Sequence, residues 1–99
     1  MSCPLVIVPE AEAELAEAHD WYENQRPGLG REFLSCIEEV FERIGLNPLA
    51  FAQSHKTVRQ TLVRRFPYVV CYTFDGESVT VIAVFHGHRE PGEWKRRLS

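Results

Sequence analysis

Apolar side chains recur at regular spacing through the first half of the chain. Residues 4–8 form a short run of branched apolar side chains, which predicts a buried strand. Pro9 follows with glutamates close behind it, a pattern typical of a helix start. Four apolar side chains then share one helical face: Ala11, Leu15, Ala18 and Tyr22. We expect this helix to end at Pro27 and Gly28.

A second helix is predicted from about Leu29 to Ile44. Its apolar positions form one stripe: Phe33, Leu34, Ile37, Val40, Phe41 and Ile44. Charged side chains occupy the other side, as in a helix that packs one face on a core. Gly45 and Asn47-Pro48 stop the helix. Because few residues separate the two helices, we expect an antiparallel helical hairpin.

Three strands are predicted in the second half, at about 58–65, 67–74 and 78–86, whereas residues 48–57 show no period and read as a loop. Asp75-Gly76 between two apolar runs is a hairpin signal. The order β-α-α-β-β-β predicts an α+β fold, with the helical hairpin packed on one face of a mostly antiparallel sheet. A length of 99 residues allows a single domain, 1–99.

Alternation divides the side chains of the last two strands between two faces. The larger apolar set is expected to face the helices: Val70, Tyr72, Phe74, Val79, Val81, Ala83 and Phe85. The opposite face receives a smaller, mixed set: Val69, Cys71, Thr73, Thr80, Ile82, Val84 and His86. No third layer is visible, so this face is expected to stay open as an apolar binding surface. The alternative is that residues 48–57 or the C-terminal segment fold over it.

Charge is divided unevenly along the chain. Residues 1–54 hold three basic and ten acidic side chains, a net charge of −7, whereas residues 55–99 hold eight basic and four acidic ones, a net charge of +4. One basic region on an acidic molecule suits an anionic partner. The alternative is that the glutamates simply cover the solvated faces of two helices.

Cysteine usage and hydropathy limit the class of protein. Cys3, Cys36 and Cys71 are odd in number and share no CxxC spacing, so neither a disulfide framework nor a zinc site is expected. The apolar run Leu5 to Val8 is too short for a secretory signal or a membrane span. We expect a cytoplasmic protein with no membrane association. The core of so small a domain leaves no room for a large cofactor, and none is expected.

A family resemblance rests on residues 64–91 and on Trp94. The stretch RRFPYVVCYTFDGESVTVIAVFHGHREP has an Arg-Phe-Pro-Tyr entry to one strand and a His-Gly-His-Arg-Glu-Pro exit from the next. With the β-α-α-β-β-β order, it resembles the RelE/ParE superfamily. These are the toxins of bacterial type II toxin–antitoxin systems, often labelled plasmid stabilization proteins. The resemblance covers nearly the whole chain.

The resemblance implies one of two activities. RelE-like members are metal-independent endoribonucleases that cut messenger RNA in the ribosomal A site, with basic and aromatic side chains on the open sheet face. Fixed arginines suit this reaction because negative charge develops in the transition state, and a histidine, tyrosine or carboxylate can move the protons. ParE-like members keep the fold, lack that set of residues and are associated with inhibition of DNA gyrase.

Comparison with the RelE-like pattern, residue by residue, favours the ParE branch. The arginine that those nucleases place after the tyrosine of the Pro-Tyr step would fall at Val69, and no tyrosine follows Tyr72. Trp94 lies near the place of a catalytic tyrosine, but an indole does not transfer a proton at neutral pH. Arg89 does match the arginine at the end of the last strand.

The two histidines near the end of the last predicted strand allow several interpretations. His86 and His88 are spaced to chelate a metal, but no third ligand is predictable and no metal site is expected. Either imidazole could act as an acid or base near neutral pH, so Arg89, His86 and His88 would be catalytic if the chain were a nuclease. Otherwise His86 packs at the sheet edge and His88 is solvated. Cys71 and His86 could form a nucleophile and base, but nothing in the sequence orients them.

Two surfaces are expected to contact partners. The basic side chains would contact the target or a nucleic acid: Arg64, Arg65, Lys95, Arg96 and Arg97. Because adjacent strand residues point to opposite faces, only one of Arg64 and Arg65 can join the open face. The antitoxin contact is expected at apolar and aromatic positions: Val69, Ile82, Val84 and Trp94. A large ring such as that of Trp94 normally docks as an anchor.

We therefore expect the toxin component of a type II toxin–antitoxin system. It would bind a cellular target, DNA gyrase for ParE-like members, and be neutralised by a cognate antitoxin. One alternative is a ribosome-dependent messenger-RNA endoribonuclease of the RelE type, with the ribosome and messenger RNA as partners. The other alternative is a non-toxic protein-interaction domain.

Overall fold

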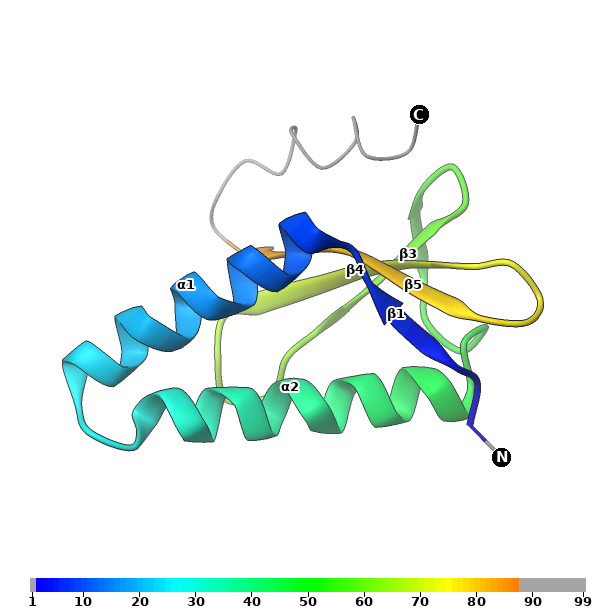
Figure 1. Cartoon of the computed structure of the whole chain (residues 1–99). Helices are drawn as coiled ribbons and strands as arrows, with labels where there is room; N and C mark the ends of the chain where they lie inside the picture. The colour runs from blue at the N-terminus through cyan, green and yellow to red at the C-terminus, as the bar shows by residue number, and fades with distance from the viewer. Residues whose placement is uncertain (1, 88–99) are drawn as a thin grey trace.

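The computed structural model describes residues 2–87 of the chain (Figure 1). Its elements are, in order, β1 (Leu5–Ile7), α1 (Pro9–Gln25), α2 (Leu29–Leu46), β2 (Gln53–His55), β3 (Val58–Leu62), β4 (Tyr68–Phe74) and β5 (Val79–His86). One five-stranded sheet has the strand order β1-β5-β4-β3-β2. β1 runs parallel to β5, and the other neighbours are antiparallel. The predicted α+β class and the helical hairpin on a mostly antiparallel sheet are confirmed, with one additional strand.

The additional strand and the end of β3 depart from the sequence-based expectation. Residues 48–57 were expected to be a loop, but Gln53–His55 pair with β3. A polar strand of three residues carries too little alternation to be recognised. β3 ends at Leu62 and not at residue 65, because the chain turns there. Arg65 has a φ of 73°, the left-handed conformation of a turn, and the N–H of Val63 donates to the carbonyl of Tyr68.

Glu23 holds the turn between the two helices. Its carboxylate oxygens accept the backbone N–H groups of Gly28 at 2.9 Å and Gly30 at 3.0 Å. The first amides of a helix have no acceptor within it, so Glu23 acts on α2 as a capping side chain does. Both hydrogen bonds lower the pKa of the Glu23 carboxyl, and the bond from Gly28 has the larger effect. Neither helix is long and apolar enough, within residues 2–87, to cross a membrane.

The main core lies between the two helices and one face of the sheet (Figure 1). The predicted stripes of both helices are buried there: Ala11, Ala18, Tyr22, Phe33, Ile37, Val40 and Ile44. The sheet contributes Val70, Tyr72, Val79, Val81 and Val84. The Tyr72 hydroxyl donates to the carbonyl of Pro48 at 2.6 Å, and Arg59 Nη1 donates to the carbonyl of Phe51 at 2.6 Å. These two bonds fasten the segment after α2 to the same face.

A β-bulge in β5 changes the faces of the strand's second half. Tyr72 pairs with Val81 and Cys71 pairs with Ala83, so Ile82 is the extra residue of β5. One extra residue interrupts the alternation, and the residues beyond it exchange faces.

The assignment of faces from the sequence is therefore correct up to Ile82 and wrong beyond it. Val84 is 1% exposed in the helix-side core, and His86 pairs with Tyr68 on that side. Ala83 and Phe85 belong to the opposite face. The expectation failed because it assumed an unbroken period of two along β5.

The face opposite the helices is not an open apolar surface at its centre, which corrects a second expectation. A small buried cluster lies there: Val58, Val69, Cys71, Ile82 and Ala83. Val69 is 9% exposed and Ile82 is 4% exposed. Exposed apolar side chains lie at the two margins of this face, Val6 on β1 and Leu62 on β3. A partner would reach the margins of this face more readily than its centre.

Candidate functional site

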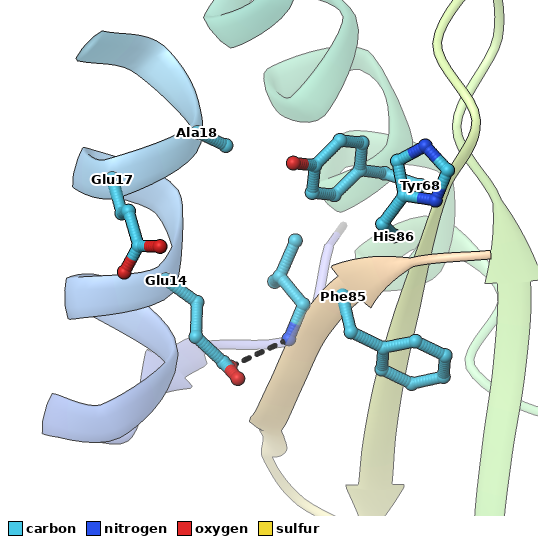
Figure 2. A pocket seen from close by; sticks show the side chains of 7 residues that line it. Glu14, Glu17, Ala18, Tyr68, Phe85 and His86 are labelled. Atoms are coloured by element: carbon cyan, nitrogen blue, oxygen red, sulfur yellow. Dashed lines mark hydrogen bonds between the residues drawn. The ribbon is translucent and has the colours of Figure 1, made fainter. Parts of the chain in front are cut away.

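A cavity lies between α1 and the end of β5. Its volume is about 140 Å³, and its described lining is Glu14, Glu17, Ala18, Tyr68, Val84, Phe85 and His86. Figure 2 shows the two glutamates on α1 facing β5, with Tyr68 and His86 on the other wall. The cavity therefore combines apolar contacts with two carboxylates, a phenol and an imidazole.

Glu14 connects α1 to the part of β5 that β1 leaves uncovered. β1 ends at Ile7, which pairs with Val81. Beyond that point Glu14 Oε1 accepts the backbone N–H of Val84 at 3.0 Å, the dashed line in Figure 2. A buried amide without an acceptor is costly, so the carboxylate stabilises the edge of the strand. This bond also holds the Glu14 side chain at the cavity.

Tyr68 and His86 form the sheet wall of the cavity. They are cross-strand partners, with ring centroids 5.5 Å apart and an interplanar angle of 75°. Tyr68 also contacts Phe33 and Tyr22 edge to face, with centroid distances of 5.1 and 6.1 Å. Aromatic contacts of this kind hold a ring in one orientation. His86 was expected on the open face, but the bulge places it here, half-buried.

The bulge also separates His86 from Cys71. Cys71 pairs with Ala83 on the face opposite the helices, and its Sγ lies 3.5 Å from Gln60 Oε1. The nucleophile–base interpretation of Cys71 and His86 is therefore wrong, because the two side chains lie on different faces of the sheet. Within residues 2–87, no three side chains of His, Cys, Asp or Glu gather so as to hold a metal ion.

Arg64 and Arg65 lie in the turn after β3, and both pair with glutamates of α2. Arg65 Nη2 lies 2.9 Å from Glu32 Oε1, and Arg64 Nη1 lies 3.6 Å from Glu39 Oε1. The expectation that one of them joins the open face is wrong, because the strand ends before either residue. The hydrogen bond between Arg65 and Glu32 raises the pKa of Arg65 and lowers that of Glu32. Both arginine side chains remain more than half exposed.

The two segments that carry the family resemblance meet in space. The N–H of Gly87 donates to the carbonyl of Pro67 at 2.7 Å, just beyond the last pair of β4 and β5. Phe66, next to Pro67, is buried against Tyr22 and Phe33, with ring centroids 4.9 and 5.3 Å away. The Arg-Phe-Pro-Tyr entry therefore has a structural role, since it anchors one end of the sheet to the helical hairpin.

A second hollow lies on the face opposite the helices. Its volume is about 400 Å³, and its described lining is Val8, Thr57, Thr73, Phe74, Asp75, Thr80 and Ile82. Thr73 and Thr80 are cross-strand partners on this face. Among the predicted antitoxin contacts within residues 2–87, Ile82 lines this hollow, whereas Val69 does not. Val84 lies in the core on the other side of the sheet, so its predicted place on a binding surface is wrong.

Several of the predicted site residues lie outside the described residues: His88, Arg89, Trp94, Lys95, Arg96 and Arg97. Glu14 and Glu17, which were expected on the solvated face of the first helix, both line the cavity, where Glu17 is exposed and Glu14 is half-buried. One signal was available. Glu14 follows Ala11 by one helical turn and Glu17 precedes Ala18, so both flank the buried stripe of α1.

Comparison with known proteins identifies the family. The family model described as "ParE toxin of type II toxin-antitoxin system, parDE" matches residues 5–91. The chain belongs to the ParE toxin family. Toxin ParE2 of Mycobacterium tuberculosis, in strains CDC 1551 / Oshkosh and ATCC 25618 / H37Rv, is 32% identical over 89 residues, which cover 89% of this chain and 85% of the relative. The predicted membership of the RelE/ParE superfamily and the preference for its ParE branch are confirmed.

A solved structure supports the fold of this ParE toxin. The chromosomal ParDE TA system from P. aeruginosa matches with a TM-score of 0.75 and 17% sequence identity, over 86% of this chain and 96% of that one. The expectation of a toxin of a type II toxin–antitoxin system is likewise confirmed by the family match. The matched range includes β1, both helices and every described residue of the cavity.

Proposed function

We propose that this ParE toxin acts by binding a cellular protein, that DNA gyrase is its target, and that a cognate antitoxin neutralises it. The family match over residues 5–91 carries the proposal. Gyrase acts on the bacterial chromosome, so the proposal also implies a cytoplasmic protein. The basic side chains that we expect to contact the target remain those of Arg64, Arg65, Lys95, Arg96 and Arg97.

The geometry of residues 2–87 favours binding over RNA cleavage. Phosphoryl chemistry on RNA needs basic and proton-transferring groups that converge on one position. Arg64 and Arg65 instead extend to glutamates on α2, while His86 lines the cavity beside α1. Val69 occupies the place of an expected arginine and is buried.

The hollow opposite the helices supports an antitoxin contact. It is concave, and its lining combines apolar side chains with threonine hydroxyls, which is the composition of a site for one or two side chains of a bound polypeptide. Val6, exposed beside Thr80 on the same face, extends the apolar surface to the sheet margin. An antitoxin segment along β1 and β5 would cover both the hollow and Val6.

Two activities, measured in parallel, test the target. Expression of the toxin without its antitoxin should arrest growth, and purified toxin should inhibit supercoiling by gyrase. The triple variant of Lys95, Arg96 and Arg97 to Ala should inhibit gyrase less, whereas Arg31→Ala, an exposed arginine on α2, should act as the wild type does. If the toxin instead cleaves messenger RNA on translating ribosomes and leaves gyrase active, the nuclease alternative replaces this proposal. Normal growth would exclude toxicity.

A substitution in the hollow tests the antitoxin contact. Thr73→Arg should fill the hollow and weaken antitoxin binding about tenfold or more, because the bulky cation removes contact area and leaves a charge to desolvate. Ser35→Arg, on the exposed side of α2, is the matched control and should bind as the wild type does. Equal antitoxin affinity of all three proteins in calorimetry would contradict a contact at this hollow.

A further inference from the structure

The hollow opposite the helices lies between two turns at one end of the sheet (Figure 1). Thr57 comes from the turn between β2 and β3, and Asp75 begins the turn between β4 and β5. Each turn is held by a side chain of its own. Gln53 Nε2 donates to the carbonyl of Lys56 at 3.3 Å, and Asp75 Oδ1 accepts the N–H groups two and three residues later, each at 2.8 Å. The walls are therefore in place before a ligand binds, which lowers the entropic cost of binding.

Two threonine side chains form the polar part of the hollow. Thr73 on β4 and Thr80 on β5 are cross-strand partners, and both are half-buried. Threonines in this relation often bond each other, yet neither hydroxyl has a hydrogen-bonding partner among residues 2–87. A hydroxyl offers one donor and two acceptors. Two such groups therefore lie next to each other and can bond a ligand.

Charge at the hollow limits the class of ligand. Asp75 is the only charged side chain of the described lining, and its negative charge disfavours phosphates and carboxylates. Its oxygens are engaged within its own turn, where Oδ1 accepts two N–H groups and Oδ2 lies 3.5 Å from Ser78 Oγ. A cation would therefore lose its hydration without gaining a dedicated partner. The hollow favours a neutral polar group.

The apolar part of the lining suits a short methylene stem. Val8 and Ile82 line the hollow together with the threonines, and Val6, opposite Thr80, is 56% exposed on the same face. Asparagine and glutamine combine such a stem with a carboxamide. This group is neutral, and its oxygen accepts while its nitrogen donates, so one carboxamide can bond two hydroxyls through separate atoms.

We propose that Thr73 and Thr80 form a receptor for one carboxamide, the side chain of an asparagine or glutamine of the antitoxin. The inference rests on the proposed antitoxin contact at this hollow and names the group that is recognised there. The two hydroxyls fix the orientation of the carboxamide, while the apolar lining contacts its stem.

Isosteric substitutions test the hydroxyls without filling the hollow. Thr73→Val and Thr80→Val keep the branched shape and remove the hydroxyl, so each should weaken antitoxin binding about threefold or more in calorimetry. Thr61→Val is the matched control and should bind as the wild type does, because Thr61 pairs with Val70 on the helix side of the sheet. Thermal melts check that each variant is folded. Wild-type affinity of both hollow variants would overturn the receptor.

A titration with small molecules tests the hollow without the antitoxin. Propionamide added to the full chain should shift the backbone amide resonances of Thr73 and Thr80, and the double variant Thr73→Val/Thr80→Val should lose this response. Propylammonium and 1-propanol, which share an apolar stem and differ in the polar group, should shift these resonances less. Equal shifts with the three compounds, or none with propionamide, would overturn the assignment to a carboxamide.

A double-mutant cycle locates the carboxamide on the antitoxin. Each asparagine and glutamine of the antitoxin is replaced by alanine in turn. One replacement should weaken binding to the wild-type toxin and have little further effect on Thr73→Val/Thr80→Val. If none does so, a backbone amide of the partner bonds the threonines and the assignment to a side chain is wrong.

The variant Thr73→Arg separates the two proposals. If it weakens the complex and the valine variants do not, the receptor fails and the proposed antitoxin contact stands. Wild-type affinity of Thr73→Arg would remove the proposed contact and the receptor with it.

Discussion

The carboxylate of Glu14 accepts the backbone N–H of Val84 at 3.0 Å, across 70 residues of sequence. The bond joins the first helix to the last described strand at the point where β1 no longer covers β5. Both residues also line the cavity, so one hydrogen bond serves the stability of the sheet edge and the shape of the candidate site.

Removing the Glu14 acceptor should destabilise the fold. In Glu14→Ala the part-buried amide of Val84 loses its acceptor, and we expect the free energy of unfolding to fall by about 1–3 kcal/mol. Glu14→Gln should cost less, because its amide oxygen can still accept the bond. Urea denaturation measures both values, and hydrogen exchange of the Val84 amide should be faster in Glu14→Ala. An unchanged denaturation midpoint would contradict this role.

The bulge in β5 predicts an unequal response at neighbouring positions. Val84→Lys places a charge in the helix-side core and should cost about 4 kcal/mol or more. Phe85→Lys should be tolerated better, because Phe85 is only half-buried and a lysine stem can cover apolar surface while its charge stays in water. Thermal melts followed by circular dichroism provide the comparison. The opposite ranking would be expected if β5 alternated without a bulge.

The close approach of the two helices depends on the absence of a side chain at Gly30. A Cβ added there would lie 2.6 Å from His19 Cδ2 and 2.7 Å from the His19 backbone oxygen. Gly30→Ala must therefore move α1 away from α2 and should cost about 1–3 kcal/mol, despite the better helix propensity of alanine. Ser35→Ala, exposed on the same helix, should stay within about 0.5 kcal/mol of the wild type. Equal stability of the two variants would show that α1 and α2 can move apart at this point without cost.

Acid should remove the stabilisation that Glu23 provides to the helical turn. Its pKa is lowered from 4.5 in the folded chain, so the unfolded chain binds the proton more readily. The contribution of Glu23 is complete above pH 4.5 and is lost as the pH falls through the lowered pKa. Glu23→Gln should therefore melt at a lower temperature than the wild type at pH 7. The gap should narrow as the pH falls below 4.5, and a gap that stays constant on acidification would argue against the capping role.

Much of the fold could be predicted because its signals are local. The stripes of α1 and α2 appear in the sequence at helical spacing, and both are buried. The Asp75-Gly76 turn is formed by hydrogen bonds and backbone angles within the same few residues. Asp75 Oδ1 accepts the N–H groups of Glu77 and Ser78, each at 2.8 Å, and Gly76 has a φ of 97°. A turn of this kind needs no tertiary contact to be recognised.

The candidate site could not be predicted in the same way, because its geometry depends on one inserted residue. β5 reads VTVIAVFH, with no glycine or proline to mark the extra position. Val81, Ile82 and Val84 are all branched and apolar, so either face could accept them. The pairing with β4 determines which residue is extra, and pairing is not visible along a single strand. Arg64 and Arg65 were misplaced for a related reason, since the end of β3 depends on the left-handed turn at Arg65.

The position of β1 in the sheet has a consequence for the order of events in the cell. Leu5 pairs with Val79, so the first strand has no neighbour until the last described strand has been synthesised. Such a distant pairing forms late in folding. While β5 is still inside the exit tunnel of the ribosome, it is separated from β1. The sheet, and the surfaces built on it, are therefore completed only after β5 has left the tunnel.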